Sequence, residues 1–291
     1  MKTRQLNYGE SLGHRLTKKI LAAVGRVLPP PLWSSVLDRL ARWARLVRYL
    51  LYRRFWIWSF VTGDGPGRKR AETVMKVMPH SLVGWRGLHV TYDATLDLQR
   101  QNLDGAVVEC GVAQGGSAAL MGLVTAIDPR RRHIWLFDSY EGLPDPTAAD
   151  FKDGATGTHF RSLPRGSCLG TLEQVTELLF DELGLDRGRI TLVKGWFDAT
   201  LAANRGAVGP IALLRIDADW YESVKCCLDE LYDSVVDNGY VILDDYYSCF
   251  GAKRAVDEFL SVREIRVELI PDSRGGCYFR KPTRTTVGEP R

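Results

Sequence analysis

The 291-residue sequence lacks the cysteine patterns that mark zinc sites and disulfide-stabilised folds. Its six cysteines form no C-x-x-C pair and have no zinc-ligand spacing. Each lies in an apolar stretch typical of a strand or helix, so we interpret them as small buried side chains of a protein from a reducing compartment. These cysteines are Cys110, Cys168, Cys226, Cys227, Cys249 and Cys277.

Long uncharged apolar runs are also absent. The best candidate for a membrane span, residues 46–61, is interrupted by Arg48, Arg53 and Arg54. Each arginine would cost about 2.5–3.5 kcal/mol at the centre of a bilayer. The basic N-terminus has no compact apolar core followed by a small-residue cleavage site, as a signal peptide would have. We therefore expect a cytoplasmic protein without a membrane-spanning helix.

Charge is unevenly distributed along the chain. Residues 1–62 contain twelve Lys/Arg and two acids (+12 − 2 = +10), which leaves −6 on the remainder of a chain whose net charge is +4. A cationic arm on an acidic body favours an anionic surface as its partner, and argues against a nucleic-acid-binding domain.

The arm has two helical patterns, over residues 12–28 and from about Ser34 or Ser35 onward, separated by the prolines at 29–31. One face of the second is apolar: Val36, Leu40, Trp43, Val47, Leu50, Leu51 and Trp58. This face could bind peripherally to the inner surface of an anionic membrane. Alternatively, it could cover the protein's own catalytic domain or a second copy of the chain.

Beyond residue 68 short apolar runs alternate with helical patterns, which is typical of a doubly wound, mostly parallel α/β sheet. We predict strands at 106–110, 133–138, 190–194, 211–217 and 240–244, with helices near 117–127, 169–184 and 220–236. The predicted organisation is a basic amphipathic helical arm (1–67), an α/β domain (68–282) and a disordered tail (283–291). Ligands of such sheets bind at the carboxyl ends of the strands.

The first predicted strand leads into the glycine-rich sequence ECGVAQGGS at residues 109–117. Its glycines allow a sharp turn and close approach to a ligand, but their spacing is not the G-x-G-x-x-G of a dinucleotide site. Glu109 would repel a pyrophosphate, whereas it could help to hold the cationic amino-acid end of S-adenosylmethionine. The alternative is an ordinary tight strand–helix turn.

Two further strand ends carry candidate cofactor contacts. Asp138 ends the second strand, where a carboxylate can accept hydrogen bonds from ribose hydroxyls, unless it is only a surface cap. Trp196 and Phe197 follow the third strand and could stack on adenine or belong to the core.

Two acid pairs follow the next two strands: Asp217 with Asp219, and Asp244 with Asp245. If these strands are neighbours, the carboxylates converge, repel one another and are costly to desolvate. A divalent cation with oxygen ligands, such as Mg²⁺, relieves this cost. It would also lower the pKa of a sugar hydroxyl and align that hydroxyl with the sulfonium methyl. Asp219 is the preferred proton acceptor, because it neighbours the metal without being needed as a ligand.

Five motifs occur in order along the chain: ECGVAQGGS (109–117), FDSYEGLP (137–144), KGWFDATL (194–201), RIDADWYES (215–223) and GYVILDDY (239–246). Over residues 72–281 the set resembles the macrocin O-methyltransferase family, which methylates deoxysugars. The resemblance implies a seven-stranded, Rossmann-like class I methyltransferase fold, S-adenosylmethionine, Mg²⁺ at Asp217, Asp244 and Asp245, and a nearby aspartate base. The candidate cofactor-binding residues are Glu109, Gly111, Gly115, Ser117, Asp138, Ser139, Trp196, Phe197 and Asp217.

The sequence departs from this family in its longer basic arm and in Trp220, where we expect a smaller or sulfur-containing residue. The arm makes glycolipids and glycans plausible acceptors beside glycosylated small molecules, and we expect a homo-oligomer. Two other functions stay open: metal-dependent methylation of a phenol or catechol, and a non-catalytic scaffold at a membrane.

Overall fold

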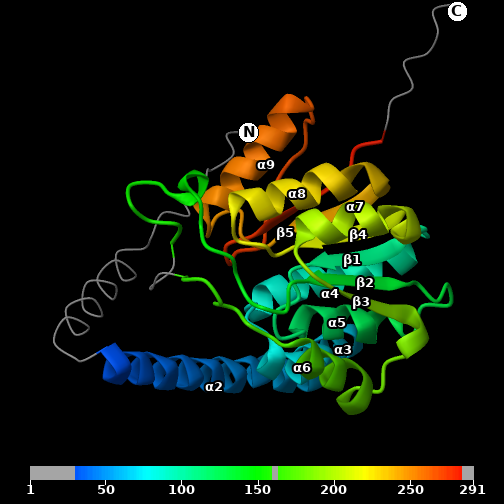
Figure 1. The fold of residues 1–291 in the computed structure, drawn as a ribbon. Helices are drawn as coiled ribbons and strands as arrows, with labels where there is room; N and C mark the ends of the chain where they lie inside the picture. Colours follow the sequence, from blue (N-terminus) through cyan, green and yellow to red (C-terminus); the bar gives the residue numbers. More distant parts are fainter. Residues whose placement is uncertain (1–29, 159–162, 284–291) are drawn as a thin grey trace, which may run out of the picture.

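The computed structural model describes residues 30–158 and 163–283, and centres on one seven-stranded sheet (Figure 1). The strand order is β3-β2-β1-β4-β5-β7-β6. The first five strands are parallel, and β7 runs antiparallel to both β5 and β6. The strands are β1 (Ala106–Cys110), β2 (Ile134–Asp138), β3 (Ile190–Lys194), β4 (Ile211–Ile216), β5 (Val235–Leu243), β6 (Ile270–Pro271) and β7 (Cys277–Arg280). The predicted doubly wound, mostly parallel α/β fold is confirmed.

Helices cover both faces of the sheet, and Figure 1 shows them as separate layers. One layer holds α3 (Gly65–Val77), α4 (Trp85–Arg100) and α5 (Gly116–Thr125). The opposite layer holds α7 (Phe197–Val208), α8 (Tyr221–Leu231) and α9 (Phe250–Val262). Successive residues of a strand point to opposite faces, so Val107 belongs to the first apolar core and Val108 to the second. The predicted helix at 169–184 is a short α6 (Leu172–Thr176) continued by a π-helical segment, Glu177–Glu182.

The N-terminal helix α2 (Pro30–Thr62) is 33 residues long and begins earlier than predicted. Its start near Ser34 or Ser35 was wrong because Pro30 and Pro31 were taken as a stop. Proline is tolerated in the first helical turn, whose N–H groups have no partner within the helix. The predicted helix over residues 12–28 and residues 284–291 of the tail lie outside the described residues.

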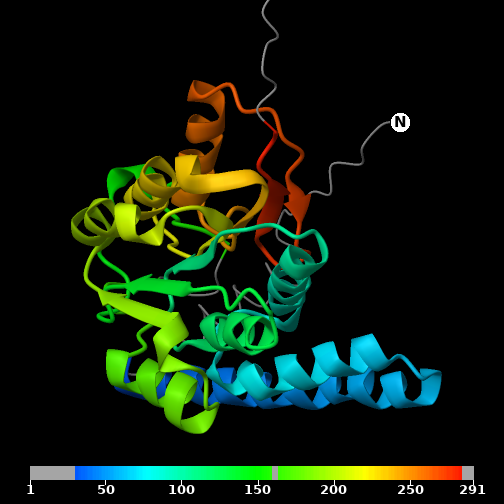
Figure 2. The same cartoon turned by 90° about the vertical axis from the view of Figure 1, so that its right-hand side faces the viewer.

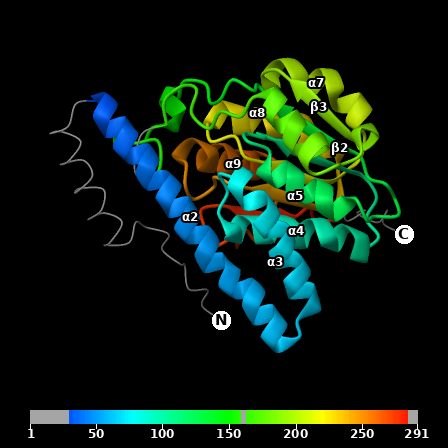
Figure 3. The same cartoon turned by 90° about the horizontal axis from the view of Figure 1, so that it is seen from below.

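A turn at Gly63 reverses the chain, and Asp64 caps α3 by accepting a hydrogen bond from the Gly67 amide at 2.9 Å. Helices α2 and α3 thus form a hairpin that reaches beyond the sheet when viewed from below (Figure 3). In the side view this blue-to-cyan hairpin lies at the base of the molecule, away from the orange α9 (Figure 2). No helix among the described residues is long and apolar enough to cross a membrane.

One side of α2 packs on the α/β sheet domain, whereas the other stays exposed. Tyr52 is buried in the core, and its hydroxyl lies 2.6 Å from His89 Nε2 on α4. Trp43, Leu50 and Trp58 are exposed. The apolar face predicted from the sequence is therefore largely uncovered among the described residues.

Candidate active site

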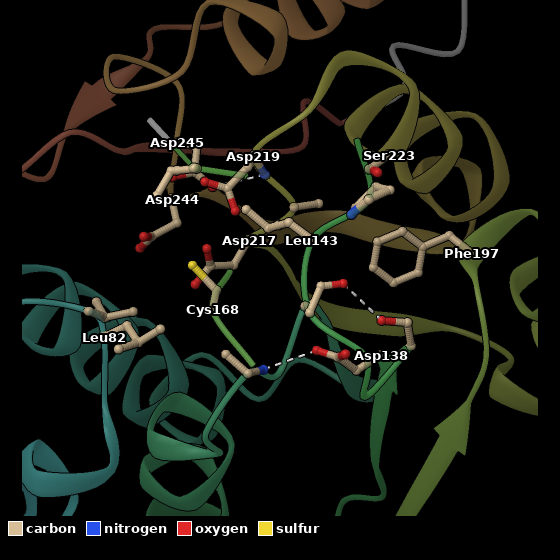
Figure 4. Close-up of a pocket in the computed structure, with 18 of the residues that line it drawn as sticks. Leu82, Asp138, Leu143, Cys168, Phe197, Asp217, Asp219, Ser223, Asp244 and Asp245 are labelled. Carbon is tan, nitrogen blue, oxygen red and sulfur yellow. Dashed lines mark hydrogen bonds between the residues drawn. The ribbon is translucent and has the colours of Figure 1, made fainter. Parts of the chain in front are cut away.

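A cavity of about 270 Å³ opens at the carboxyl ends of the parallel strands, where ligands of such sheets bind. In Figure 4 Asp138 and Phe197 lie on one side of it, and the aspartates after β4 and β5 lie on the other. The predicted site residues that line the cavity are Gly111, Asp138, Ser139, Trp196, Phe197, Asp217, Asp219, Asp244 and Asp245. Glu109, Gly115 and Ser117 are not in its wall.

The turn after β1 requires glycine at position 111. Gly111 has a φ of +88°, and a Cβ there would lie 1.8 Å from the carbonyl oxygen of Asp217. The Asp217 amide donates to the Cys110 carbonyl at 2.8 Å. The end of β4 is thus held directly against the glycine-rich turn, which brings the predicted cofactor loop and the acid cluster to one cavity.

Asp138 holds the glycine-rich loop in place. Its Oδ2 accepts hydrogen bonds from the amides of Val112 (2.7 Å) and Ala113 (3.0 Å), and its Oδ1 accepts one from the Tyr140 amide (2.6 Å). A carboxylate offers about four lone-pair positions, so about one remains for a ligand hydroxyl. The neighbouring Ser139 hydroxyl is used within its own turn, since it donates to the Gly142 carbonyl and accepts from the Glu141 amide.

Aromatic side chains border the cavity beyond Asp138. Trp196 precedes α7 and is 36% exposed, whereas Phe197 is half-buried and packs against the core of α7 and α8. Both line the cavity. A flat, apolar face is therefore available next to Asp138.

Arg215 organises the acids from within β4. It is fully buried; its Nη1 lies 3.3 Å from Glu109 Oε1 and 2.9 Å from Asp217 Oδ2, and its Nη2 lies 2.7 Å from Asp244 Oδ1. Sequence reasoning did not single out this arginine. The sequence did contain an indication of its role, because Arg215 is the one charged residue of the apolar strand that precedes Asp217 and Asp219.

Glu109 lies behind the cavity wall and is paired with Arg215. Burial raises the pKa of its carboxyl to about 8, although the Arg215 charge opposes the shift. Its Oε2 is buried and has no hydrogen-bond partner among the described residues. Glu109 thus contributes to the charge balance under the glycine-rich turn.

Asp217, Asp244 and Asp245 offer carboxylate oxygens that lie within 4.8 Å of one another. Burial, and then the charge of Asp244, raises the pKa of Asp217 well above its ordinary value. Burial, and then the charge of Asp219, does the same for Asp245. Arg215 and Arg274 therefore do not offset the full cost of ionising these carboxyls. A divalent cation would offset it, and an all-oxygen donor set of this kind fits Mg²⁺.

Asp244 is the exception within this cluster. Burial acts to raise its pKa, but Arg274 and Arg215 outweigh burial, so the pKa of Asp244 is lowered. Arg274 Nη1 lies 2.6 Å from Asp244 Oδ2, and Arg274 also lines the cavity. No sequence spacing pointed to Arg274, which reaches Asp244 only because β7 folds back along β5.

Asp219 lies next to this cluster in a strained conformation, with a φ of +53°. Its Oδ1 accepts a hydrogen bond from Cys249 Sγ at 3.4 Å, and its amide donates to Asp245 Oδ2 at 3.2 Å. Burial, and then the charge of Asp217, raises the pKa of Asp219 to about 7. Asp219, Asp245 and Cys249 form a second set of close donor atoms, but a thiol is poorly suited to Mg²⁺.

Trp220, the residue that departs from the expected family pattern, is buried and does not line the cavity. Its Nε1 donates to the Pro144 carbonyl at 3.0 Å. Pro144 and Leu143 do line the cavity. Trp220 thus influences the cavity by fixing the loop after β2.

Comparison with known proteins agrees with this arrangement. Residues 58–281 match the family model described as Macrocin-O-methyltransferase (TylF). The chain is 35% identical over 204 residues to the demethyldecarbamoylnovobiocin O-methyltransferase of Streptomyces niveus, covering 69% of this chain and 76% of that enzyme. It is 30% identical over 207 residues to the 8-demethyl-8-(2,3-dimethoxy-alpha-L-rhamnosyl)-tetracenomycin-C 4′-O-methyltransferase of Streptomyces olivaceus, covering 69% and 77%.

Among solved structures, that of the O-methyltransferase NovP aligns with a TM-score of 0.62 at 33% identity, covering 70% of this chain and 83% of that one. Methyl transfer in this family implies S-adenosylmethionine as the donor. With the fold, the site geometry and these matches in agreement, the chain belongs to the macrocin O-methyltransferase family of O-methyltransferases.

Proposed function

We propose that this protein transfers the methyl group of S-adenosylmethionine to a sugar hydroxyl in a Mg²⁺-dependent reaction. The acceptor would be a glycosylated small molecule, a glycolipid or a glycan. The observation that carries the proposal is the convergence of Asp217, Asp244 and Asp245 within 4.8 Å, in the same cavity as the Gly111 turn and Asp138. A relative whose name specifies a rhamnosyl acceptor supports a sugar.

In this proposal the residues that would hold the cofactor line the wall that runs from the glycine-rich turn to Phe197. Asp138, next to Ser139, would accept a hydrogen bond from a ribose hydroxyl through its remaining lone pair. Trp196 and Phe197 would contact the adenine. Glu109 would act from behind the wall, where the cationic end of the cofactor would favour its ionised form and attract its charge. Gly111 and Gly115 allow the close approach, and the buried Ser117 Oγ, which has no partner among the described residues, is available nearby.

Asp217, Asp244 and Asp245 would hold the metal, with Asp217 at the boundary with the cofactor. Bound there, Mg²⁺ would polarise the acceptor hydroxyl and favour its ionisation. Asp219 would take the hydroxyl proton as the acceptor oxygen bonds to the methyl carbon. S-Adenosylmethionine bound there would supply this methyl group, with the electron pair of the broken carbon–sulfur bond remaining on sulfur in S-adenosylhomocysteine.

The test compares methyl transfer to a methyl rhamnoside with transfer to catechol, in the presence of Mg²⁺ and of EDTA. We expect transfer to the glycoside alone, and only with the metal. Turnover of catechol alone would support the phenol alternative, whereas S-adenosylmethionine binding with no transfer to either acceptor would support the scaffold alternative. Full activity in EDTA would contradict the metal-assisted reaction.

An Asp244→Asn variant makes the test specific to the metal site. The amide oxygen coordinates more weakly than a carboxylate, so we expect activity to fall and to recover partly at high Mg²⁺ or Mn²⁺. Asp229→Asn is the control, because Asp229 lies on the exposed surface of α8 and pairs only with Lys225 among the contacts of the described residues. Its activity should match the parent protein.

We further propose that residues 1–62 make peripheral contact with an anionic membrane at its cytoplasmic face, and that the protein is a homo-oligomer. Their +10 charge and the exposed Trp43, Leu50 and Trp58 of α2 support the membrane contact. The exposed apolar face of α2 is also a candidate interface between copies.

A further inference from the structure

A second cavity, of about 460 Å³, lies between α2 and the segment that precedes α4. Helix α2 contributes Leu46 and Tyr49 to its lining, and Met78, Pro79 and Trp85 face them from the catalytic domain. Arg48, Ser81 and Gln114 also border the cavity, and the Ser81 hydroxyl already exchanges hydrogen bonds with the backbone of Val83. The lining side chains are otherwise apolar or aromatic.

This cavity adjoins the active-site cavity across one short segment, residues 81–84. Val83 lines both cavities, Leu82 lines only the active-site cavity, and Gly84 lines only the second one. A Cβ at Gly84 would lie 3.2 Å from the side chain of Arg274, which pairs with Asp244. Only residues 81–84 therefore separate a molecule bound near the acid cluster from the second cavity.

Apolar surface continues outward from the second cavity along α2. Leu46, Leu50 and Leu51 are each about half exposed, and such surface gains stability when hydrocarbon covers it. A hydroxyl-rich sugar ring would gain little there. Farther along, Trp58 and Val61 are exposed with Arg53 and Arg54 on the same helix. This combination suits a lipid–water interface.

We infer that the second cavity binds the hydrocarbon chain of a lipid-linked glycoside whose sugar occupies the active-site cavity. The inference rests on the proposed sugar methylation and narrows its acceptor to an amphipathic glycolipid. A hydrocarbon chain fits the observations better than a ring-shaped aglycone, because the helix that forms the cavity wall also carries the surface suited to a membrane.

The test measures the binding of n-butyl, n-hexyl, n-octyl and n-decyl rhamnosides to the full-length protein by calorimetry, below their critical micelle concentrations. Apolar burial predicts a Kd that falls roughly fourfold per added methylene until the cavity is filled. A Kd that does not depend on chain length, or no binding by any member of the series, overturns the inference. A p-nitrophenyl rhamnoside that binds as tightly as the decyl compound would favour a ring-shaped aglycone and also overturn it.

Two variants on α2 test whether the alkyl chain of the rhamnoside binds in the second cavity. Leu46→Glu places a charge in the cavity wall and should weaken decyl rhamnoside binding about tenfold or more, with no change in the affinity for S-adenosylmethionine. Ile57→Glu is the matched control, since Ile57 lies on the same helix and is similarly exposed but does not line the cavity. Equal losses in both variants would show a general effect of charge on α2 and would contradict the inference.

Methyl transfer to methyl rhamnoside separates this inference from the proposed function. If that transfer occurs and depends on Mg²⁺, while chain length has no effect on binding, only the inference that the second cavity binds a hydrocarbon chain is wrong. If none of the rhamnosides, short or long, is methylated but chain length governs binding, the proposed reaction fails and the chain-binding cavity stands.

Discussion

Among the described residues, Glu109, Asp217, Asp219, Asp244 and Asp245 crowd the acid cluster, and two arginines pair with members of it. Arg215 contacts Glu109, Asp217 and Asp244, and Arg274 contacts Asp244. Removing one partner of a buried ion pair leaves an uncompensated charge, which commonly costs about 3–5 kcal/mol. The stability of the site thus depends on Arg215 more than on any single acid.

An Arg215→Met variant should lower the free energy of unfolding by about 3–5 kcal/mol, as measured by urea denaturation. The side chain that replaces it fits the buried strand but cannot neutralise three acids. Arg215→Lys keeps the positive charge, so its free energy of unfolding should fall by less. A loss below about 1 kcal/mol for Arg215→Met would show that the acids are protonated or compensated by other groups.

Asp219→Asn tests the proposed proton acceptor. It should lower kcat by about 10²–10⁴-fold, as expected for the loss of a general base, while the Kd for S-adenosylmethionine stays unchanged. A base acts when ionised, and burial raises the pKa of Asp219 to about 7 in the metal-free protein. The activity of the parent protein should therefore rise with pH through its Asp219 pKa, which a bound dication would lower, and the variant should lose this dependence. Recovery of the activity of Asp219→Asn at high Mn²⁺ would show that Asp219 is a metal ligand and that another residue is the base.

At the scale of elements, the docking of α2 on α4 depends on the contact between Tyr52 and His89. Burial, and then the charge of Arg70, lowers the pKa of His89 to about 4. Folding therefore keeps the ring neutral, whereas the unfolded chain takes up a proton below the ordinary pKa of about 6.5. The contribution of His89 is present above pH 6.5 and is lost as the pH falls toward 4.

We expect this single group to remove about 3 kcal/mol of stability between pH 6.5 and pH 4. Urea denaturation across this range would measure the slope. A His89→Phe variant removes the titrating group, so its stability should depend less steeply on pH than that of the parent protein. Equal slopes in the two proteins would exclude His89 as the cause.

At the scale of the whole molecule, the basic arm and the acidic body are separated in sequence, and α2 and α3 reach beyond the sheet (Figure 3). We expect the full-length protein to co-sediment with vesicles of phosphatidylserine and phosphatidylcholine at low salt. Higher salt should release it, because exposed charges are screened. Failure to bind at low salt would leave packing or self-association as the role of the exposed face of α2.

A Trp58→Asp variant should weaken vesicle binding about ten- to hundredfold, since burial of one large apolar side chain contributes about 1.5–3 kcal/mol. Ile127→Asp serves as the control, because Ile127 is also exposed but follows α5. Comparable losses in both variants would show that added negative charge alone weakens binding.

The sequence by itself determined the architecture of the sheet and its chemically active edge. Short apolar runs such as 106–110 and 190–194 can be buried on both faces only as parallel strands between helices, and both were predicted with their observed limits. The same alternation put Asp217, Asp219, Asp244 and Asp245 after two strands. Strand β5 was predicted too short, because Asp237-Asn238-Gly239 resembles a turn. The structure continues the strand through these residues, with Asn238 at a φ of +62°.

Only the tertiary structure decided which groups meet across long sequence separations. Arg215 contacts Glu109 across 106 residues, and Arg274 contacts Asp244 because β7 pairs antiparallel with β5. Neither contact follows from periodicity, which describes one element at a time. The cavity between α2 and residues 78–85 likewise forms only where α2 packs against the rest of the chain, with Tyr52 held against His89 of α4. The local sequence pattern thus specified the helices and strands and the reactive residues that follow them. Burial and charge balance are properties of the packed chain, and they decided how these residues assemble into a site.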